Sequence, residues 1–189
     1  MLFRSDQFEV VVTLAVHPGE IWAQALDAEA RNSLDLLMKD INEYCVQAAV
    51  PTSPPKPGQE CCAQFSQDGV WYRARVLECL PSDQIAVQYV DFGNSECLTP
   101  NMLRSMKDEF FKLPAQALKL SLANIRPAHQ VWSQEAVKWL EVIVNRQMKA
   151  TVVHRLSEHL VVLLEDWNVP NGPVNINEEL ISRGHAVKT

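Results

Sequence analysis

The segment Tyr89-Val-Asp-Phe-Gly-Asn94 gathers residue types that can do chemistry. It contains Asp-Phe-Gly, the triplet whose aspartate holds magnesium in protein kinases. A kinase also needs a glycine-rich loop, a strand lysine and a His-Arg-Asp loop, and this sequence contains none of them. The Gly-x-x-x-x-Gly-Lys-Ser/Thr loop that cradles phosphates is absent as well. The sequence therefore disfavours phosphoryl transfer, and the rings, glycine and amide of this segment need another explanation.

Aromatic side chains are concentrated around this segment. They make up 7% of the chain, yet five of them fall between Phe65 and Phe92. Trp71 directly precedes Tyr72, so on a strand the two point to opposite faces, and we expect Trp71 to fill the core. The other four rings are predicted to line one pocket: Phe65, Tyr72, Tyr89 and Phe92.

One of these rings needs a bend in the backbone to join the others. Tyr89 and Phe92 are three positions apart, so a straight strand would place them on opposite faces. Gly93 accepts positive φ without penalty and permits a bend there. The amide oxygen of Asn94 can then accept a hydrogen bond from a bound N–H group.

Several ring faces around one slot attract a cation through their quadrupoles, at roughly 0.5–2 kcal/mol per contact. Methylation keeps the charge of an arginine while removing hydrogen-bond donors, which lowers the cost of desolvating it. The pattern therefore predicts a cage for a methylated cation. The ring set alone does not distinguish arginine from lysine.

The elements before the cage fall into two parts. The first fifty residues predict two strands around a turn at 17–19, followed by an amphipathic helix from Ala28 to about Cys45 with Asp27 as its cap. Val50–Gly58 holds four prolines and predicts a stiff, extended linker.

Short, closely spaced strands follow the linker, with a hairpin signal at Asp68-Gly69 and a break near Gly93. They predict a small, strongly bent antiparallel barrel, which a helical turn or two then leaves. The remaining residues predict a strand within 115–125, a helix capped by Ser133, a hairpin over 148–166 and a last helix starting near Asn175.

The two flanks are too short to bury separate cores, so we expect them to pair into one α+β domain that carries the barrel as an insertion. The predicted parts are residues 1–50 (two strands and a linker helix), 58–113 (the barrel) and 114–189.

Residues Gly58 to about Leu113 resemble the Tudor domain, through the Trp-Tyr-Arg-Ala segment at 71–74 and the Tyr-x-Asp-Phe-Gly-Asn segment at 89–94. The flanks resemble the staphylococcal-nuclease-like, OB-fold half of the extended Tudor modules in germline proteins, by element order and by "NINEELISRGHA". The resemblance implies an α+β, mainly β fold in which a small bent Tudor barrel is inserted into a staphylococcal-nuclease-like OB-fold domain.

The resemblance also implies a function. It implies a methylarginine reader whose cage for symmetrically dimethylated arginine consists of Phe65, Tyr72, Tyr89, Phe92 and Asn94. The usual partners of the family are the arginine-methylated tails of PIWI proteins, which such modules scaffold in piRNA-pathway assemblies. The usual location is the cytoplasm, in germ granules. Phe92 stands where tyrosine is common, a change that keeps the ring and loses a hydroxyl.

Charge and composition bound the alternatives. A net charge of −6 argues against a broad nucleic-acid surface and is compatible with an arginine-rich partner. A scaffold or RNA-contacting module with a vestigial cage stays open as the alternative. No run of eighteen apolar residues exists, so we expect no membrane span. We expect a monomeric module of a longer multi-domain protein.

We expect no catalytic residues, no metal and no cofactor. Nuclease chemistry would need clustered carboxylates and an arginine around calcium, whereas Glu9 and Glu20 are isolated in the N-terminal strands. The five cysteines form no C-x-x-C pair, so we expect small buried hydrophobes rather than a zinc site or a disulfide framework.

Five charged residues near the cage receive expectations of their own. We expect Asp91 to bond backbone amides within the bend, as aspartates in turns do. Arg73 and Arg75 are expected on a solvated face. Asp68 and Glu96 are expected to face arginines that neighbour the modified one on a bound peptide.

Overall fold

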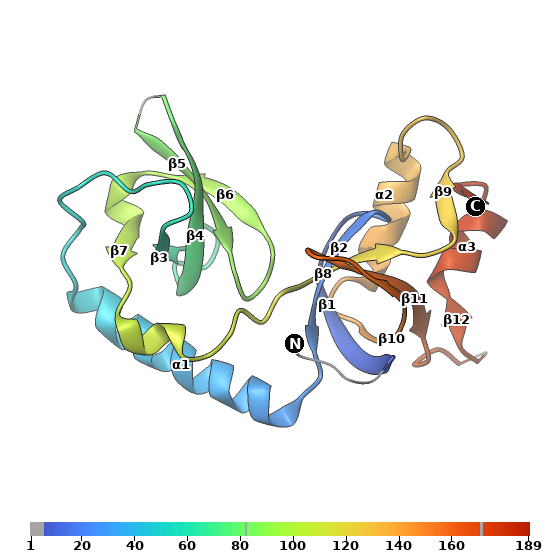
Figure 1. Ribbon diagram of the computed structural model, residues 1–189, viewed down its shortest axis with the longest axis horizontal. Helices are drawn as coiled ribbons and strands as arrows, with labels where there is room; N and C mark the ends of the chain where they lie inside the picture. The colour runs from blue at the N-terminus through green and yellow to red at the C-terminus, as the bar shows by residue number, and fades with distance from the viewer. Residues whose placement is uncertain (1–5, 82, 171) are drawn as a thin grey trace. The chain divides into compact units, whose positions relative to one another are not determined.

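The computed structural model describes residues 6–81, 83–170 and 172–189 (Figure 1). The chain divides into two compact units. The flanking unit is formed by the segment up to Leu26 together with Ala117–Thr189, and the barrel unit is Asp27–Gln116. Among the described residues, no helix combines the length and apolarity needed to cross a membrane.

The flanking unit is built on a sheet whose strands close into a ring. The sheet contains β1 (Gln7–His17), β2 (Glu20–Ala25), β8 (Leu118–Leu122), β10 (Gln147–Arg155), β11 (Leu160–Asp166) and β12 (Val174–Asn175), in the order β10-β1-β2-β8-β11-β12. Strand β10 also pairs with β11, which closes five of the strands. The pair of β8 and β11 is parallel and the other pairs are antiparallel.

Alternating apolar residues of these strands form the core of this unit. Val10, Val12, Ile21 and Leu120 are fully buried in it. Two short helices add their apolar faces, α2 (Gln134–Leu140) and α3 (Ile176–Ser182). This is the α+β, mainly β arrangement that the sequence predicts.

The helix caps of this unit confirm their predictions. Ser133 Oγ accepts a hydrogen bond from the backbone N–H of Ala136 at 3.1 Å, and Asn175 Oδ1 accepts one from Glu178 at 3.1 Å. The sequence reading missed the short strands β9 (Ile125–Pro127) and β13 (Ala186–Lys188), as well as the 3-10 turn η3 (Glu141–Ile143). Elements of three residues are too short to show a hydrophobic period.

The barrel unit contains a strongly bent sheet of five strands, drawn in green in Figure 1. They are β3 (Glu60–Gln64), β4 (Trp71–Leu80), β5 (Gln84–Tyr89), β6 (Ser95–Leu98) and β7 (Leu103–Ser105), in the order β6-β5-β4-β3-β7. Two 3-10 turns, η1 (Pro100–Met102) and η2 (Asp108–Phe111), flank β7. The sequence predicts only helical turns between the barrel and residue 114. Leu103 instead lies buried opposite Ala63 in β7, which extends the sheet.

Helix α1 (Ala28–Gln47) belongs to the barrel unit, whereas the sequence reading assigned residues 1–50 to the flanks. Ile41 and Cys45 of its apolar stripe pack against Trp71, which is 5% exposed. The side chain of Asn42 also accepts a hydrogen bond from the backbone N–H of Trp71 at 2.9 Å and donates one to its carbonyl at 3.0 Å. These contacts attach the helix to the start of β4.

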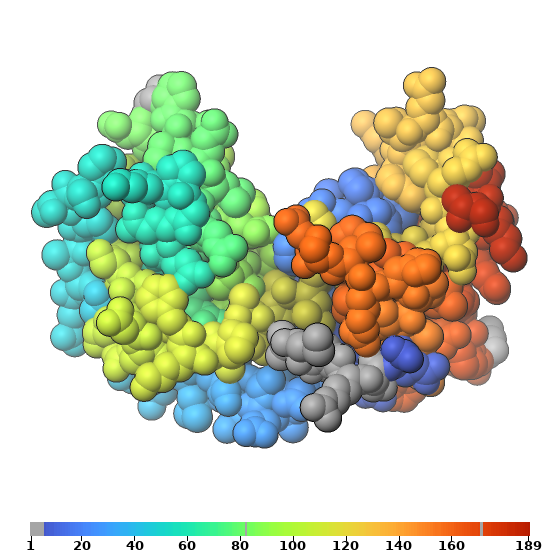
Figure 2. All heavy atoms as spheres, viewed as in Figure 1, coloured from blue at the N-terminus to red at the C-terminus, as the bar shows by residue number. Residues whose placement is uncertain are grey.

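The proline-rich segment after the helix is mostly exposed on the barrel unit (Figure 2). It borders a cavity of about 340 Å³ whose lining includes Pro51, Pro55, Cys79 and Arg104. Cys79 lies at the end of β4 that is distant from Tyr72, and no cage residue lines this cavity.

Candidate functional site

The four rings that the sequence singles out, Phe65, Tyr72, Tyr89 and Phe92, pack against one another in the barrel unit. Ring centroids are 6.3 Å apart for Phe65 and Tyr72, 5.4 Å for Phe65 and Tyr89, 5.7 Å for Tyr72 and Tyr89, and 5.3 Å for Tyr72 and Phe92. The interplanar angles run from 76° to 85°, so every contact is edge to face. Rings set nearly at right angles to one another can form adjoining walls of a cage.

Strand register brings three of these rings together. Tyr72 lies opposite Ala63, two residues before Phe65, and Tyr89 lies opposite Ala74, two residues after Tyr72. Tyr72 and Tyr89 are therefore diagonal neighbours on one face, a distance that aromatic side chains can bridge.

The fourth ring depends on the bend after β5. The carbonyl oxygen of Tyr89 accepts hydrogen bonds from the backbone N–H groups of Phe92 at 3.2 Å and Gly93 at 2.8 Å. Gly93 has a φ of +91°, a conformation that other residues rarely adopt. The resulting turn places the ring of Phe92 against Tyr72 and so resolves the three-residue spacing as predicted.

Asn94 closes the turn beside the rings. Its backbone carbonyl oxygen accepts a hydrogen bond from the backbone N–H of Tyr89 at 2.9 Å. The half-buried amide side chain makes no hydrogen bond within the described part of the chain. The donors and the acceptor of this amide are thus not used by the described residues.

Two carboxylates contact the hydroxyl groups of the cage tyrosines. Tyr72 donates to Asp68 Oδ2 at 2.8 Å, and Tyr89 donates to Glu96 Oε1. Burial, together with the bond to Asp68, raises the pKa of Tyr72 to about 12. Burial and the bond to Glu96 also raise the pKa of Tyr89. Both rings therefore remain neutral phenols at physiological pH, and both carboxylates contact tyrosines rather than only facing a peptide.

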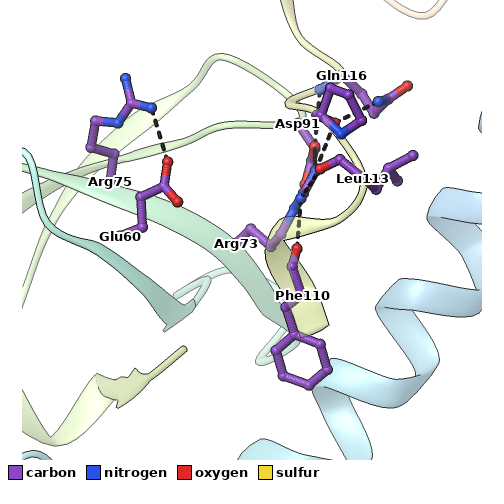
Figure 3. Close-up of polar contacts among 8 residues, drawn as sticks. Glu60, Arg73, Arg75, Asp91, Phe110, Leu113 and Gln116 are labelled. Atoms are coloured by element: carbon purple, nitrogen blue, oxygen red, sulfur yellow. Dashed lines mark hydrogen bonds and ion pairs between the residues drawn. The ribbon is translucent and has the colours of Figure 1, made fainter. Parts of the chain in front are cut away.

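Arg73 and Asp91 form a buried ion pair close to the cage rings in sequence (Figure 3). Arg73 is 3% exposed and Asp91 is 1% exposed. Arg73 donates to Asp91 from Nε at 2.9 Å and from Nη2 at 2.6 Å. Its other donors reach the backbone carbonyls of Phe110, Leu113 and Pro114.

The expectation of a solvated Arg73 was wrong. Arg73 is not solvated, because the segment Phe110–Gln116 covers its side of β4. Asp91 pairs with Arg73 and also accepts a hydrogen bond from the backbone N–H of Gln116 at 3.0 Å. Arg75 does lie on the surface as expected, where it pairs with Glu60 at 3.0 Å.

Sequence reasoning thus found the rings and missed their supports. Asp91 lies between Tyr89 and Phe92 in sequence, and Arg73 directly follows Tyr72. The ion pair therefore holds backbone positions directly next to Tyr72 and Phe92 and two residues from Tyr89. The sequence did contain a signal for the pair. Arg73 and Asp91 carry opposite charges, and each directly adjoins a ring residue, Tyr72 or Phe92.

The cysteines divide between core and surface. Cys45, Cys61 and Cys62 are buried as expected, whereas Cys79 and Cys97 are exposed on strands of the bent sheet. Burial raises the pKa of Cys61 to about 12, which keeps that thiol protonated. Among the described residues, no cluster of three or more histidine, cysteine or acidic side chains is arranged to hold a metal ion.

Comparison with known proteins gives consistent results. Residues 4–124 match the family model of the Tudor domain. Tudor domain-containing protein 1 of Mus musculus is 34% identical over 183 residues, which cover 94% of this chain and 16% of that protein. This chain therefore corresponds to about one sixth of the relative's length.

Solved structures superpose on nearly the whole chain. The extended Tudor domain TD3 of mouse TDRD1, in complex with a MILI peptide containing dimethylarginine, has a TM-score of 0.93 and 33% identity, with 100% of this chain and 97% of that chain covered. The human TDRD1 extended Tudor domain, in complex with a symmetrically dimethylated peptide, has a TM-score of 0.91 and 31% identity, with 100% and 93% covered.

Proposed function

This chain belongs to the Tudor domain family, and from that premise we propose that it binds symmetrically dimethylated arginine without catalysing a reaction. The binding residues are Phe65, Tyr72, Tyr89, Phe92 and Asn94. The observation that carries the proposal is the set of four edge-to-face rings beside an amide that has no hydrogen bond within the described part of the chain. Ring faces and an amide oxygen hold a cation and leave its covalent bonds unchanged.

The chemistry of the cage explains the preferred modification. Each ring contact with a cation contributes roughly 0.5–2 kcal/mol, most when water is excluded. A symmetrically dimethylated guanidinium keeps one N–H on each terminal nitrogen, so it can fill the cage with methyl groups and still donate to Asn94. The asymmetric isomer loses both protons from one nitrogen. Affinity should be modest, because one side chain buries little area and a disordered tail must be ordered.

We further propose that the partner is the arginine-methylated tail of a PIWI-type protein, and that the longer protein scaffolds piRNA-pathway assemblies in cytoplasmic germ granules. The MILI complex of the mouse structural neighbour supports the choice of partner. The net charge of −6 also suits an arginine-rich tail.

Calorimetric titration of this chain with one arginine-glycine-rich peptide tests the proposal. The peptide is prepared unmodified, symmetrically dimethylated, asymmetrically dimethylated and with trimethyllysine in place of arginine. We expect the symmetric form to bind most tightly. Equal binding of all four forms, or no binding, contradicts the proposal and favours a scaffold with a vestigial cage.

Two variants locate the binding site. Phe92→Ala removes one ring and Asn94→Ala removes the amide, and each should abolish the preference for the symmetric form. Phe111→Ala is the matched control, because this phenylalanine lies in the same unit, is 46% exposed and is not part of the cage. It should leave the affinity unchanged.

A further inference from the structure

We infer that Asp68 and Glu96 supply the negative charge that balances the cation in the cage, and thereby determine how strongly the cage prefers a charged ligand. This inference rests on the proposed function. It goes beyond the rings and the amide, because it assigns part of the binding energy to two carboxylates that act from behind Tyr72 and Tyr89.

Asp68 is held in place by two bonds. Its Oδ1 accepts from the backbone N–H of Val70 at 2.8 Å, and its Oδ2 accepts from Tyr72 Oη at 2.8 Å. Both oxygens are thus directed by the hairpin turn between β3 and β4. The carboxylate lies at the hydroxyl end of a cage ring.

Glu96 connects two walls of the cage. It accepts a hydrogen bond from the hydroxyl of Tyr89, and it accepts two more from Ser66, at 3.2 Å from the backbone N–H and at 2.7 Å from Oγ. Ser66 directly follows Phe65 in the chain. Glu96 therefore stands behind Tyr89 and beside the backbone of Phe65.

Neither carboxylate has a cationic partner in the described part of the chain. The ion pairs found there pair other acidic groups, such as Asp91 with Arg73 and Glu60 with Arg75, and none includes Asp68 or Glu96. Two negative charges next to the cage are therefore not balanced by an ion pair within these residues. A bound methylarginine would bring the missing positive charge.

These charges lie close enough to act on a ligand. A carboxylate bonded to a tyrosine hydroxyl is separated from a cation on that ring's face by the ring and one hydrogen bond, which is less than the Debye length of about 8–10 Å. The attraction is less screened at Glu96, which is half-buried against Tyr89, than at Asp68, which is exposed. A neutral ligand of the same shape would gain none of it.

The test uses variants that keep the hydrogen bonds and remove the charge. In Glu96→Gln, the carbonyl can still accept from Tyr89 and from the backbone N–H of Ser66, and the new NH2 group can donate to Ser66 Oγ. In Asp68→Asn, the carbonyl can still accept from Val70, and the bond with Tyr72 is kept with its direction reversed, because the new NH2 group can donate to Tyr72 Oη.

We expect Glu96→Gln to bind the symmetrically dimethylated peptide about three- to tenfold more weakly than the unmodified chain, Asp68→Asn to show a smaller loss because Asp68 is exposed, and the double variant to be weaker than either. Glu60→Gln is the control, since this carboxylate is on the same barrel and is already paired with Arg75.

The dependence on salt separates a charge effect from a structural one. Titrations at several salt concentrations should show a shallower loss of affinity with salt in Glu96→Gln and Asp68→Asn than in the unmodified chain. Near-ultraviolet circular dichroism checks that the barrel is folded. Wild-type affinity in both variants, or weaker binding with an unchanged salt dependence, overturns the inference.

The design also distinguishes two failures. If the unmodified chain shows no preference for the methylated peptide, the proposed function is wrong and the inference fails with it. If the unmodified chain prefers the methylated peptide and the charge-removing variants do so equally well, only the role of Asp68 and Glu96 is refuted.

Discussion

Replacing Asp91 by alanine should cost the barrel unit about 3–5 kcal/mol of folding free energy, because it leaves a buried arginine without its counter-charge. Arg73 is 3% exposed and uses all five of its N–H donors, two of them on Asp91. Alanine would leave those two donors unpaired. It would also leave the backbone N–H of Gln116 without the bond that it makes to Asp91 at 3.0 Å.

The loss corresponds to an increase in the unfolding equilibrium constant of between about 150-fold and 5000-fold. Urea denaturation followed by the fluorescence of Trp71 and the other tryptophans measures it. Glu60→Ala is the control, because it breaks the exposed pair with Arg75, whose side chain is 51% exposed, and such pairs contribute about 0–1 kcal/mol.

A double variant tests the cause. Arg73→Met combined with Asp91→Ala removes the buried charge along with its partner, so it should be more stable than Asp91→Ala alone. It should not recover fully, since the carbonyls of Phe110, Leu113 and Pro114 lose their donor. If Asp91→Ala costs no more than Glu60→Ala, the argument from the buried charge is refuted.

Three more outcomes are expected. Gly93→Ala should weaken methylarginine binding and lower the folding free energy by about 1–3 kcal/mol, because Gly93 has a φ of +91°. Gly58→Ala, at a φ of +83°, should lower the folding free energy without changing binding. Calorimetry measures the binding and urea denaturation the stability. Asn42→Ala should cost about 1–3 kcal/mol in urea denaturation, since the backbone N–H and carbonyl of Trp71 lose their partner. Tyr72 has a pKa raised from 10.0 to about 12, so the folded chain should lose stability between pH 10 and pH 12, and Tyr72→Phe should lose less over that range.

The convergence of the four rings could be predicted from the sequence because it depends on local backbone geometry. Alternation along a strand separates Trp71 from Tyr72, and one glycine explains how Phe92 joins Tyr89. Both predictions need only the geometry of a strand and a bend. They do not require knowledge of what packs on the outer face of the barrel.

Arg73 shows where such reasoning stops. Strand alternation does turn it away from the cage, but the sequence does not show that Phe110–Gln116 returns to cover it. Strand β7 escaped prediction for a similar reason, since three residues carry no period and pair with β3 only through tertiary structure. The grouping of helix α1 with the barrel likewise depends on Asn42 and Trp71, which are far apart in the chain.

The interrupted path of the flanking unit has a consequence for biosynthesis. Strand β2 ends at Ala25, and its partner β8 begins only at Leu118, after the whole barrel unit. At typical ribosomal speeds, roughly 5–20 s pass before that partner is made. By the end of this interval the nascent barrel unit has all its strands, while the hairpin of β1 and β2 still exposes valine-rich edges prone to aggregation. The barrel unit would thus be complete before the flanking unit. Chaperones would be needed most for β1 and β2, the first strands of the flanking unit.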